Sequence, residues 1–153
     1  MCIRDRNMHE FLPYAWFEGK CIPFKEAKIS IATHALHYGT AAFGGMRAIP
    51  NPTNKEEFLL FRTEKHIKRL SQSAKLLLTE ISEEYIFKAL EEVIKRNKPQ
   101  KPIYIRPFVY TSDLGIAPRL HNIETDFFMY CICLLYTSPS PRDLSTSRMP
   151  SSA

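Results

Sequence analysis

The sequence predicts an α+β fold in which an antiparallel sheet packs against two helices. Short aromatic and apolar stretches separated by turn residues predict strands that lie close together in sequence. Two segments in the middle of the chain instead repeat their apolar residues every three to four positions, which is typical of amphipathic helices. The chain has 153 residues, of which 44% are hydrophobic, so it is long enough for about one domain with a packed core.

The first half of the chain predicts two β-hairpins. Glu18-Gly19-Lys20 forms the first turn, and a stretch rich in proline and asparagine at residues 50–54 forms the second. The strands expected on either side of these turns are Tyr14–Phe17, Cys21–Phe24, Phe43–Ile49 and Phe58–Phe61. Because side chains alternate along a strand, Phe43, Gly45 and Arg47 should share one face of the third strand.

Two helices follow, at residues 64–78 and 83–97, with Thr63 and Ser82 as expected N-caps. The apolar stripes expected to face the core are Ile67, Leu70, Ala74, Leu77 and Leu78, then Ile86, Ala89, Leu90, Val93 and Ile94. Arg69 lies roughly 130° from the centre of the first stripe, so it should point away from the core. It is either an ordinary exposed arginine or a residue that faces a ligand or second domain.

The last two strands are expected at Pro102–Thr111 and Asp126–Ile132, joined by a loop at residues 113–122. Alternation along the first of these strands places Arg106 on the same face as Tyr104, Phe108 and Tyr110. An arginine between aromatic residues is unusual for a plain core. Either it stacks on a ring and reaches solvent, or it offers its guanidinium to a carboxylate.

The two ends of the chain resemble sequencing-adapter artefacts. Residues 1–6 can be encoded by ATG TGT ATA AGA GAC AGN, and residues 133–138 by TGT CTC TTA TAC ACA TCT, which is nearly the reverse complement. Such an inverted repeat resembles the mosaic end of a transposase-based sequencing library. We therefore exclude residues 1–6 and 133–153 from the expected fold and expect the tail to be disordered, although residues 133–136 could extend the last strand.

Charge and composition exclude several classes of protein. The net charge is +5, but the basic residues alternate with glutamates in the helices and indicate solvated faces rather than a nucleic-acid surface. No run of eighteen apolar residues predicts a membrane span, and no leader-like segment predicts secretion. Outside the two ends only Cys21 and Cys131 remain, with no metal-site or disulfide spacing, which fits the cytoplasm.

The segment from His34 to Arg47 is the richest in unusual residues. It holds three of the five glycines of the chain, together with two histidines, Tyr38 and Phe43. Glycines are used where the backbone needs unusual dihedral angles or where another group approaches closely. The segment is therefore either the wall of a pocket or a helix end that runs through a tight turn into a strand.

Several motifs in order resemble the branched-chain amino acid aminotransferases, which are fold type IV enzymes dependent on pyridoxal 5'-phosphate (PLP). The motifs are Trp16–Gly19, His34–Arg47, Phe61-Arg62 with His66–Leu70, and Tyr104–Pro107. The family pattern Phe-Glu-Gly-x-Arg differs here, because Gly44 replaces the acidic residue. The resemblance implies that residues 7–132 are the small N-terminal domain of an incomplete enzyme.

The resemblance also implies roles for individual residues. Arg69 matches the arginine that binds the cofactor phosphate. The residues that match positions lining the substrate pocket are Tyr38, Phe43, Gly45, Tyr104 and Arg106. No lysine here matches the Schiff-base lysine, so no catalytic residue is assigned and the fragment should be inactive. The complete enzyme would transfer the amino group of leucine, isoleucine or valine to 2-oxoglutarate, in branched-chain amino acid biosynthesis, as a homodimer or higher oligomer.

Two groups of alternatives remain at this point. Within the same fold type, the chain could belong to a D-amino acid aminotransferase or an aminodeoxychorismate lyase, although the motif at residues 34–40 favours the branched-chain enzymes. From another class, it could be a stand-alone basic binding module, for instance one that contacts RNA. That alternative predicts exposed aromatic residues among the lysines of the helices, where the sequence instead shows Glu–Lys pairs.

Overall fold

The computed structural model describes residues 10–54 and 57–134. The strands are β1 (Glu10–Phe11), β2 (Tyr14–Phe17), β3 (Lys20–Pro23), β4 (Ala41–Phe43), β5 (Met46–Pro50), β6 (Phe58–Leu60), β7 (Ile103–Thr111) and β8 (Thr125–Cys133). The helices are the 3-10 helix η1 (Phe24–Glu26), α1 (His34–Tyr38), α2 (Thr63–Leu76) and α3 (Glu83–Asn97). Within the described part of the chain, no helix is long and apolar enough to cross a membrane.

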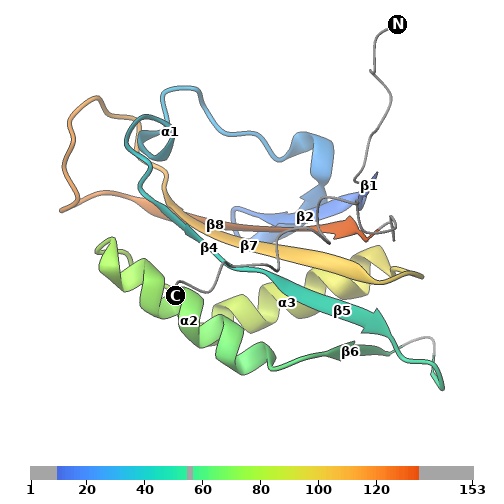
Figure 1. The fold of residues 1–153 in the computed structure, drawn as a ribbon. Coiled ribbons are helices and arrows are strands. Elements are labelled where there is room, and N and C mark those ends of the chain that lie inside the picture. The colour runs from blue at the N-terminus through green and yellow to red at the C-terminus, as the bar shows by residue number, and fades with distance from the viewer. Residues whose placement is uncertain (1–9, 55–56, 135–153) are drawn as a thin grey trace, which may run out of the picture.

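All the strands join one antiparallel sheet in the order β3-β2-β8-β7-β5-β6, with β1 added to β8 and β4 added to β7 (Figure 1). The centre of this sheet is the pair β7 and β8, which runs in continuous register from Ile103↔Cys133 to Thr111↔Thr125. Alternate residues of both strands are buried on the face that carries α2 and α3. The other face is the open face of the sheet, and its central part carries Tyr104, Arg106 and Phe108.

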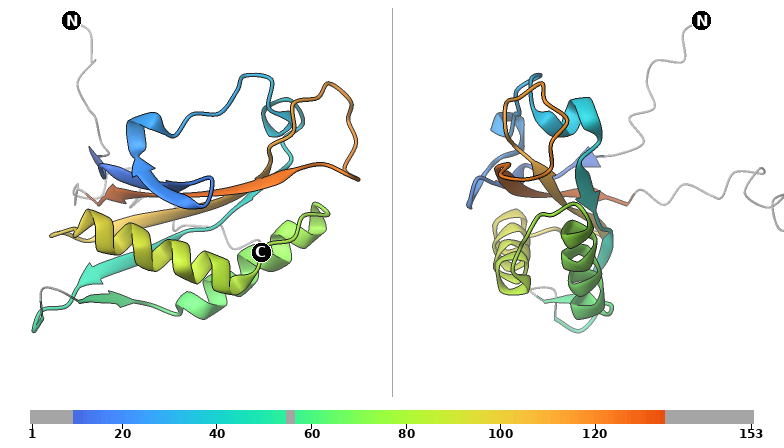
Figure 2. Two further views of the ribbon diagram at one scale, coloured as in Figure 1. Left: turned by 180° about the vertical axis from the view of Figure 1, so that it is seen from behind. Right: turned by 90° about the vertical axis from the view of Figure 1, so that its left-hand side faces the viewer.

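The two long helices lie side by side against one face of the sheet (Figure 2). Both expected apolar stripes point into the core, with Ile67, Leu70 and Ala74 buried on α2 and Ile86, Ala89, Leu90 and Val93 buried on α3. They meet the buried side chains Ile103, Ile105, Met129 and Cys131 of the central strands. The predicted cap of α3 is confirmed, since Ser82 Oγ accepts a hydrogen bond of 3.1 Å from the Tyr85 amide.

The start and the end of α2 differ from expectation. Thr63 is already the first helical residue, and the preceding N-cap is Arg62, which has φ 52° and makes no side-chain capping bond. The helix ends at Leu76, and Leu78 has φ 56° and is 68% exposed instead of buried. The backbone therefore turns before the last predicted position of the apolar stripe can reach the core.

The predicted strand Phe43–Ile49 is divided into β4 and β5, although both parts pair with β7 in one register. Gly44 donates its amide to the Pro107 carbonyl at 3.0 Å. Pro107 has no amide to donate in return, so the ladder is interrupted there. Because the register continues, Phe43 and Arg47 still share the open face, as the alternation predicts.

Three smaller features differ from the sequence-based expectation. Phe24 belongs to η1 rather than to the preceding strand, and α1 is a short complete helix rather than only a helix end. Both lie on the opposite side of the sheet from α2 and α3 (Figures 1 and 2). Cys133, which the adapter interpretation excludes from the fold, is the last residue of β8 and pairs with Ile103 and Glu10. Residues 1–6 and 135–153 lie outside the described residues.

Candidate functional site

Three of the expected substrate-binding residues meet on the open face of the sheet. The Arg106 guanidinium lies 4.4 Å from the centre of the Phe43 ring and 5.2 Å from that of the Tyr104 ring. Strand pairing explains the arrangement, since Phe43 stands opposite Phe108 on β7, two residues from Arg106. The stacking holds the guanidinium in place on the sheet.

One nitrogen of Arg106 is buried without a partner. Among the described residues, Arg106 Nε is the buried side-chain polar atom for which no hydrogen bond is found. A buried donor without a partner costs free energy, and guanidinium groups bind carboxylates through paired N–H bonds. Arg106 therefore keeps hydrogen-bonding capacity that the described residues do not use, and its role as an anion-binding residue stays a prediction.

Gly45 makes the arrangement of Tyr104 possible. A Cβ atom at residue 45 would lie 2.3 Å from Tyr104 Oη and 2.8 Å from its Cε2. These distances are too short for any side chain, so the Tyr104 ring can lie over the strand only because residue 45 is glycine. This close approach confirms the physical reason for a glycine at this position, while its role in substrate binding stays a prediction.

Gly45 and Tyr104 also line a pocket of about 480 Å³ between β5, β6 and the start of α2. Its lining residues are Gly45, Met46, Arg47, Ile49, Leu59, Leu60, Phe61, His66 and Tyr104. The lining is mainly apolar, with Arg47, His66 and the Tyr104 hydroxyl as its polar groups. Small-molecule sites usually have this composition, an apolar wall with a few polar groups that fix orientation.

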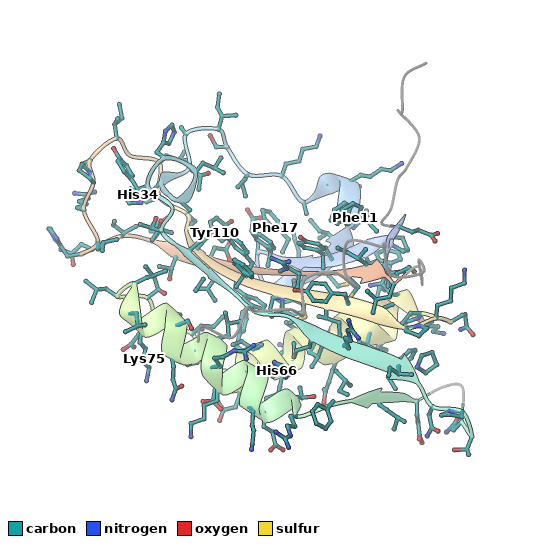
Figure 3. The ribbon with its side chains drawn as sticks, viewed as in Figure 1. Phe11, Phe17, His34, His66, Lys75 and Tyr110 are labelled. Atoms are coloured by element: carbon teal, nitrogen blue, oxygen red, sulfur yellow. The ribbon has the colours of Figure 1, made fainter. Side chains whose placement is uncertain are left out.

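His66 connects this pocket to Arg69. Both lie on α2, and Arg69 Nη2 donates a hydrogen bond of 3.2 Å to His66 Nδ1 (Figure 3 shows His66). Arg69 is exposed, as its position off the apolar stripe predicts, and it forms no ion pair with a carboxylate in the described part of the chain. Its positive charge is therefore free to bind a phosphate, which suits the geometry of a guanidinium.

Tyr38 is not among the residues that line this pocket. It lies on α1, packs against His34 with ring centroids 4.6 Å apart and ring planes tilted by 45°, and donates its hydroxyl to the Ile116 carbonyl. The structure thus brings Phe43, Tyr104 and Arg106 together and holds Tyr38 in a separate contact.

The pKa shifts that are resolved belong to groups outside the pocket. Burial, with a smaller contribution from Glu18, raises the pKa of Asp126 above its ordinary value, and burial also raises the pKa of Tyr110. Burial raises the pKa of the Cys131 thiol to about 12. Asp126 and Tyr110 contact each other at 3.5 Å near the end of β7, so they form a separate polar pair.

Comparison with known protein families shows to which family the chain belongs. The family model described as amino-transferase class IV matches residues 42–153, which is more than half of the chain. The chain belongs to the class IV aminotransferases. This assignment confirms the family resemblance that the motifs indicate.

Individual relatives of this class IV aminotransferase chain are branched-chain enzymes. This chain is 59% identical over 123 residues to a probable branched-chain-amino-acid aminotransferase of Synechocystis sp. The match covers 80% of this chain and 40% of the relative. The chain thus spans about 40% of the length of the curated relatives it matches. This coverage agrees with the expectation that the sequence is a fragment.

Solved structures of class IV aminotransferases share the fold. A branched-chain aminotransferase of Thermoproteus uzoniensis, solved with norvaline, superposes with a TM-score of 0.73 at 28% identity, covering 81% of this chain and 41% of that chain. The branched-chain enzyme of Thermobaculum terrenum in its PLP-form gives a TM-score of 0.69 at 28% identity, covering 80% and 40%. These likenesses confirm the predicted α+β fold of the small domain.

The sequence alone indicates no role for two histidines of this class IV aminotransferase chain, one in the pocket lining and one in a buried polar network. His66 appears in a family-like motif, but only the structure shows that it lines the pocket and accepts a bond from Arg69. His34 is 2% exposed and hydrogen-bonded through both ring nitrogens. The spacing of His66 and Arg69, three residues apart on a predicted helix, was the available signal for the first of these contacts.

Proposed function

We propose that the longer protein containing this chain is a PLP-dependent aminotransferase that moves the amino group of leucine, isoleucine or valine to 2-oxoglutarate. The observation that carries the proposal is Arg106, whose guanidinium is stacked between two aromatic rings with a buried nitrogen unpartnered. The names of the relatives support the reaction, since they are branched-chain-amino-acid aminotransferases.

The residues of α2 fit the phosphate group of the cofactor. Arg69 is exposed and free of carboxylate partners, and His66 holds one of its nitrogens from the pocket side. We therefore assign the phosphate to Arg69, with His66 orienting the guanidinium. When bound, PLP supplies an electron sink for the carbon that loses its proton.

The open face of the sheet fits the two unlike substrates of the reaction. Phe43 is 60% exposed and offers an apolar wall for a branched side chain. Arg106, beside it, offers N–H donors for a carboxylate, and the ring of Tyr104 limits how far the guanidinium can move. Phe43 would thus accommodate leucine, while Arg106 would bind the additional carboxylate of glutamate or 2-oxoglutarate.

We further propose that the chain of 153 residues is inactive alone and that the complete enzyme is a cytoplasmic homodimer or higher oligomer. Lys65, Lys68 and Lys75 on α2 are exposed, and none matches the Schiff-base lysine of the family. Borohydride reduction of the chain after incubation with PLP should therefore give no single stoichiometric lysine adduct. A specific adduct together with turnover of leucine would contradict this part of the proposal.

The cofactor assignment is tested by Arg69→Ala in the complete enzyme. A charge-assisted contact is worth about 1.5–3 kcal/mol, so PLP affinity should fall roughly tenfold to hundredfold while folding is little affected. Lys68→Ala is the matched control, because Lys68 is exposed on the same helix. If Arg69→Ala retains PLP through dialysis as well as Lys68→Ala does, Arg69 does not bind the phosphate.

A further inference from the structure

A buried histidine lies at the centre of a polar network at one end of the sheet. The His34 ring is 2% exposed and stands where α1 meets the end of β7 (Figure 3). Its Nδ1 lies 2.9 Å from Thr40 Oγ1 and 3.1 Å from Thr111 Oγ1, and its Nε2 lies 3.1 Å from the Ala117 carbonyl oxygen. Thr40 and Thr111 also contact each other through their hydroxyls.

The partners determine which nitrogen carries the proton in the neutral ring. A carbonyl oxygen only accepts, so Nε2 must donate to Ala117. Nδ1 can then accept from the Thr40 hydroxyl. The Thr111 hydroxyl in turn donates to Thr40, either to its Oγ1 or to its main-chain oxygen. This arrangement gives every member of the network a partner and describes His34 as the Nε2–H tautomer.

The bond to Ala117 attaches a loop whose side chains are mostly exposed. Residues 113–120, here called the tethered loop, connect β7 to β8, and most of their side chains are exposed. The His34 amide donates to the Asp113 carbonyl at 2.9 Å, and Thr33 forms a bridge with Leu114. His34 therefore holds the tethered loop at two points, with its amide at the start and its ring at Ala117.

Tyr38 is fixed by the same contacts. Its ring packs at a tilt against the His34 ring, with centroids 4.6 Å apart, and its hydroxyl donates to the carbonyl of Ile116, the neighbour of Ala117. Gly39 follows with φ 66°, which ends α1 directly after Tyr38. The position of Tyr38 thus depends on two contacts: its ring contacts the His34 ring, and its hydroxyl bonds the Ile116 carbonyl. His34 provides the first contact and, through Ala117, holds the residue next to Ile116.

We propose that His34 is a positioning residue that, as the neutral Nε2–H tautomer, holds the tethered loop against α1 and thereby orients Tyr38. The inference rests on the proposed function only in taking Tyr38 as a residue that contacts substrate, the role that the family resemblance implies for it. The network itself consists of contacts within this chain, so it can be tested without substrate or cofactor.

The tautomer is tested by nitrogen-15 NMR of the imidazole ring in the full chain. We expect the His34 Nε2 signal to be that of a protonated nitrogen and the Nδ1 signal that of an unprotonated one. His121 is the internal reference, because it is exposed and no hydrogen bond to its ring is found in the described part of the chain, whereas His37 Nε2 lies 3.0 Å from the Ile31 carbonyl oxygen. A His34 ring protonated at Nδ1, or one that averages between tautomers, would overturn the proposal.

The tether is tested by limited trypsin digestion, which reports on the tethered loop through cleavage after Arg119. His34→Leu removes the partly buried bond to Ala117 and should raise this cleavage rate up to about tenfold, the effect of losing one hydrogen bond. His34→Gln keeps an N–H donor and should remain close to the parent rate. Cleavage after Arg47, in β5, reports on global opening and should not change.

The control variant His37→Leu removes an exposed histidine from the same helix and should leave cleavage after Arg119 unchanged. Equal rates in the parent and His34→Leu, or equal rates in His34→Leu and His34→Gln, would refute the tether. If His34→Leu unfolds the whole chain, cleavage after Arg47 rises in parallel with cleavage after Arg119. The tautomer seen by NMR and the cleavage rate of His34→Gln then decide whether His34 tethers the loop. None of these outcomes depends on whether the complete protein is an aminotransferase.

Discussion

Arg106 shows a conflict between stability and binding in a single side chain. Its guanidinium gains from stacking on Phe43 and Tyr104, an interaction worth about 0.5–1 kcal/mol per exposed pair. Its buried Nε lacks a hydrogen-bond partner, a penalty of about 1–3 kcal/mol. The two stacking contacts and the penalty are of similar size, so Arg106 adds little net stability to the isolated fold.

We therefore predict that Arg106→Met does not destabilise the chain and raises its free energy of unfolding by up to about 1 kcal/mol. Methionine keeps the stem between the rings but removes the unpaired nitrogen. Arg96→Met is the matched control, because Arg96 also stacks on a ring, that of Tyr14 at 4.7 Å, but is exposed. Urea unfolding measures both, and a larger loss for Arg106→Met than for Arg96→Met would contradict the interpretation.

Gly45 and Tyr104 should show strong energetic coupling. Gly45→Ala forces the Tyr104 ring to move, because a Cβ would lie 2.3 Å from its hydroxyl, and we expect a cost of about 1–3 kcal/mol. In a Tyr104→Ala background the same substitution should cost much less. Gly115→Ala, which meets no atom within 4 Å, is the control. Equal costs in both backgrounds would show that the close contact is unimportant.

The Cys131 thiol predicts how stability changes in alkaline solution. Its pKa is about 12 in the fold against 9.0 for a free thiol, so above pH 9 the unfolded chain loses a proton that the folded chain keeps. Stability should therefore fall as pH rises from 9 towards 12, by at most about 1.4 kcal/mol per pH unit for this group. Cys131→Val should flatten the dependence above about pH 9 in urea unfolding. An unchanged slope would locate its origin elsewhere, for instance in Tyr110, whose pKa is also raised.

At the scale of the elements, the sequence was most informative where the spacing of apolar residues agreed with the residues that begin and end a helix. The α3 helix has a capping serine, acidic residues in its first turn and a clear apolar stripe, and its bounds were predicted to the residue. The end of α2 was missed, because the apolar pair Leu77-Leu78 extends the pattern after the backbone has turned. The division of β4 from β5 was missed because its cause, Pro107, lies on a different strand.

The two long helices begin differently, and this difference can be measured. Ser82→Ala should cost about 1 kcal/mol, because Ser82 accepts the Tyr85 amide at the start of α3. Thr63→Ala should cost less than half as much, because Thr63 lies inside α2 and caps nothing. Equal losses in urea unfolding would mean that Thr63 acts as a cap in solution, as its sequence position suggested.

The candidate site was predicted in part, for reasons that also appear at this scale. Alternation along two strands placed Phe43 and Arg106 on faces that strand pairing then joined. The contacts of His34 with Thr111 and Ala117 span 77 and 83 residues, and no local pattern in the sequence predicts such distances. Helical spacing placed Arg69 correctly off the core, but it could not show that His66 lines the pocket.

For the molecule as a whole, we propose that residues 139–153, which lie outside the described residues, do not contribute to thermal stability. The segment is rich in serine and proline, a composition that in general offers too little apolar area to offset an ordering cost of about 1–2 kcal/mol per residue. Truncation after Ser138 should leave the melting temperature unchanged within error. A drop of several degrees, the outcome that a family match extending to residue 153 would favour, would show that the tail contributes to the fold.

The place of β8 in the sheet has a consequence for synthesis of the protein. The last strand of the described chain, β8, lies between β2 of the first hairpin on one side and β7 on the other. A ribosome therefore delivers residues 14–23 long before the strand that will lie beside them exists. One edge of the first hairpin therefore stays unpaired, exposed to other chains and to chaperones, until its partners Phe128 and Met129 have left the exit tunnel. Slow codons within β8 would prolong this vulnerable interval, whereas slow codons after it would not.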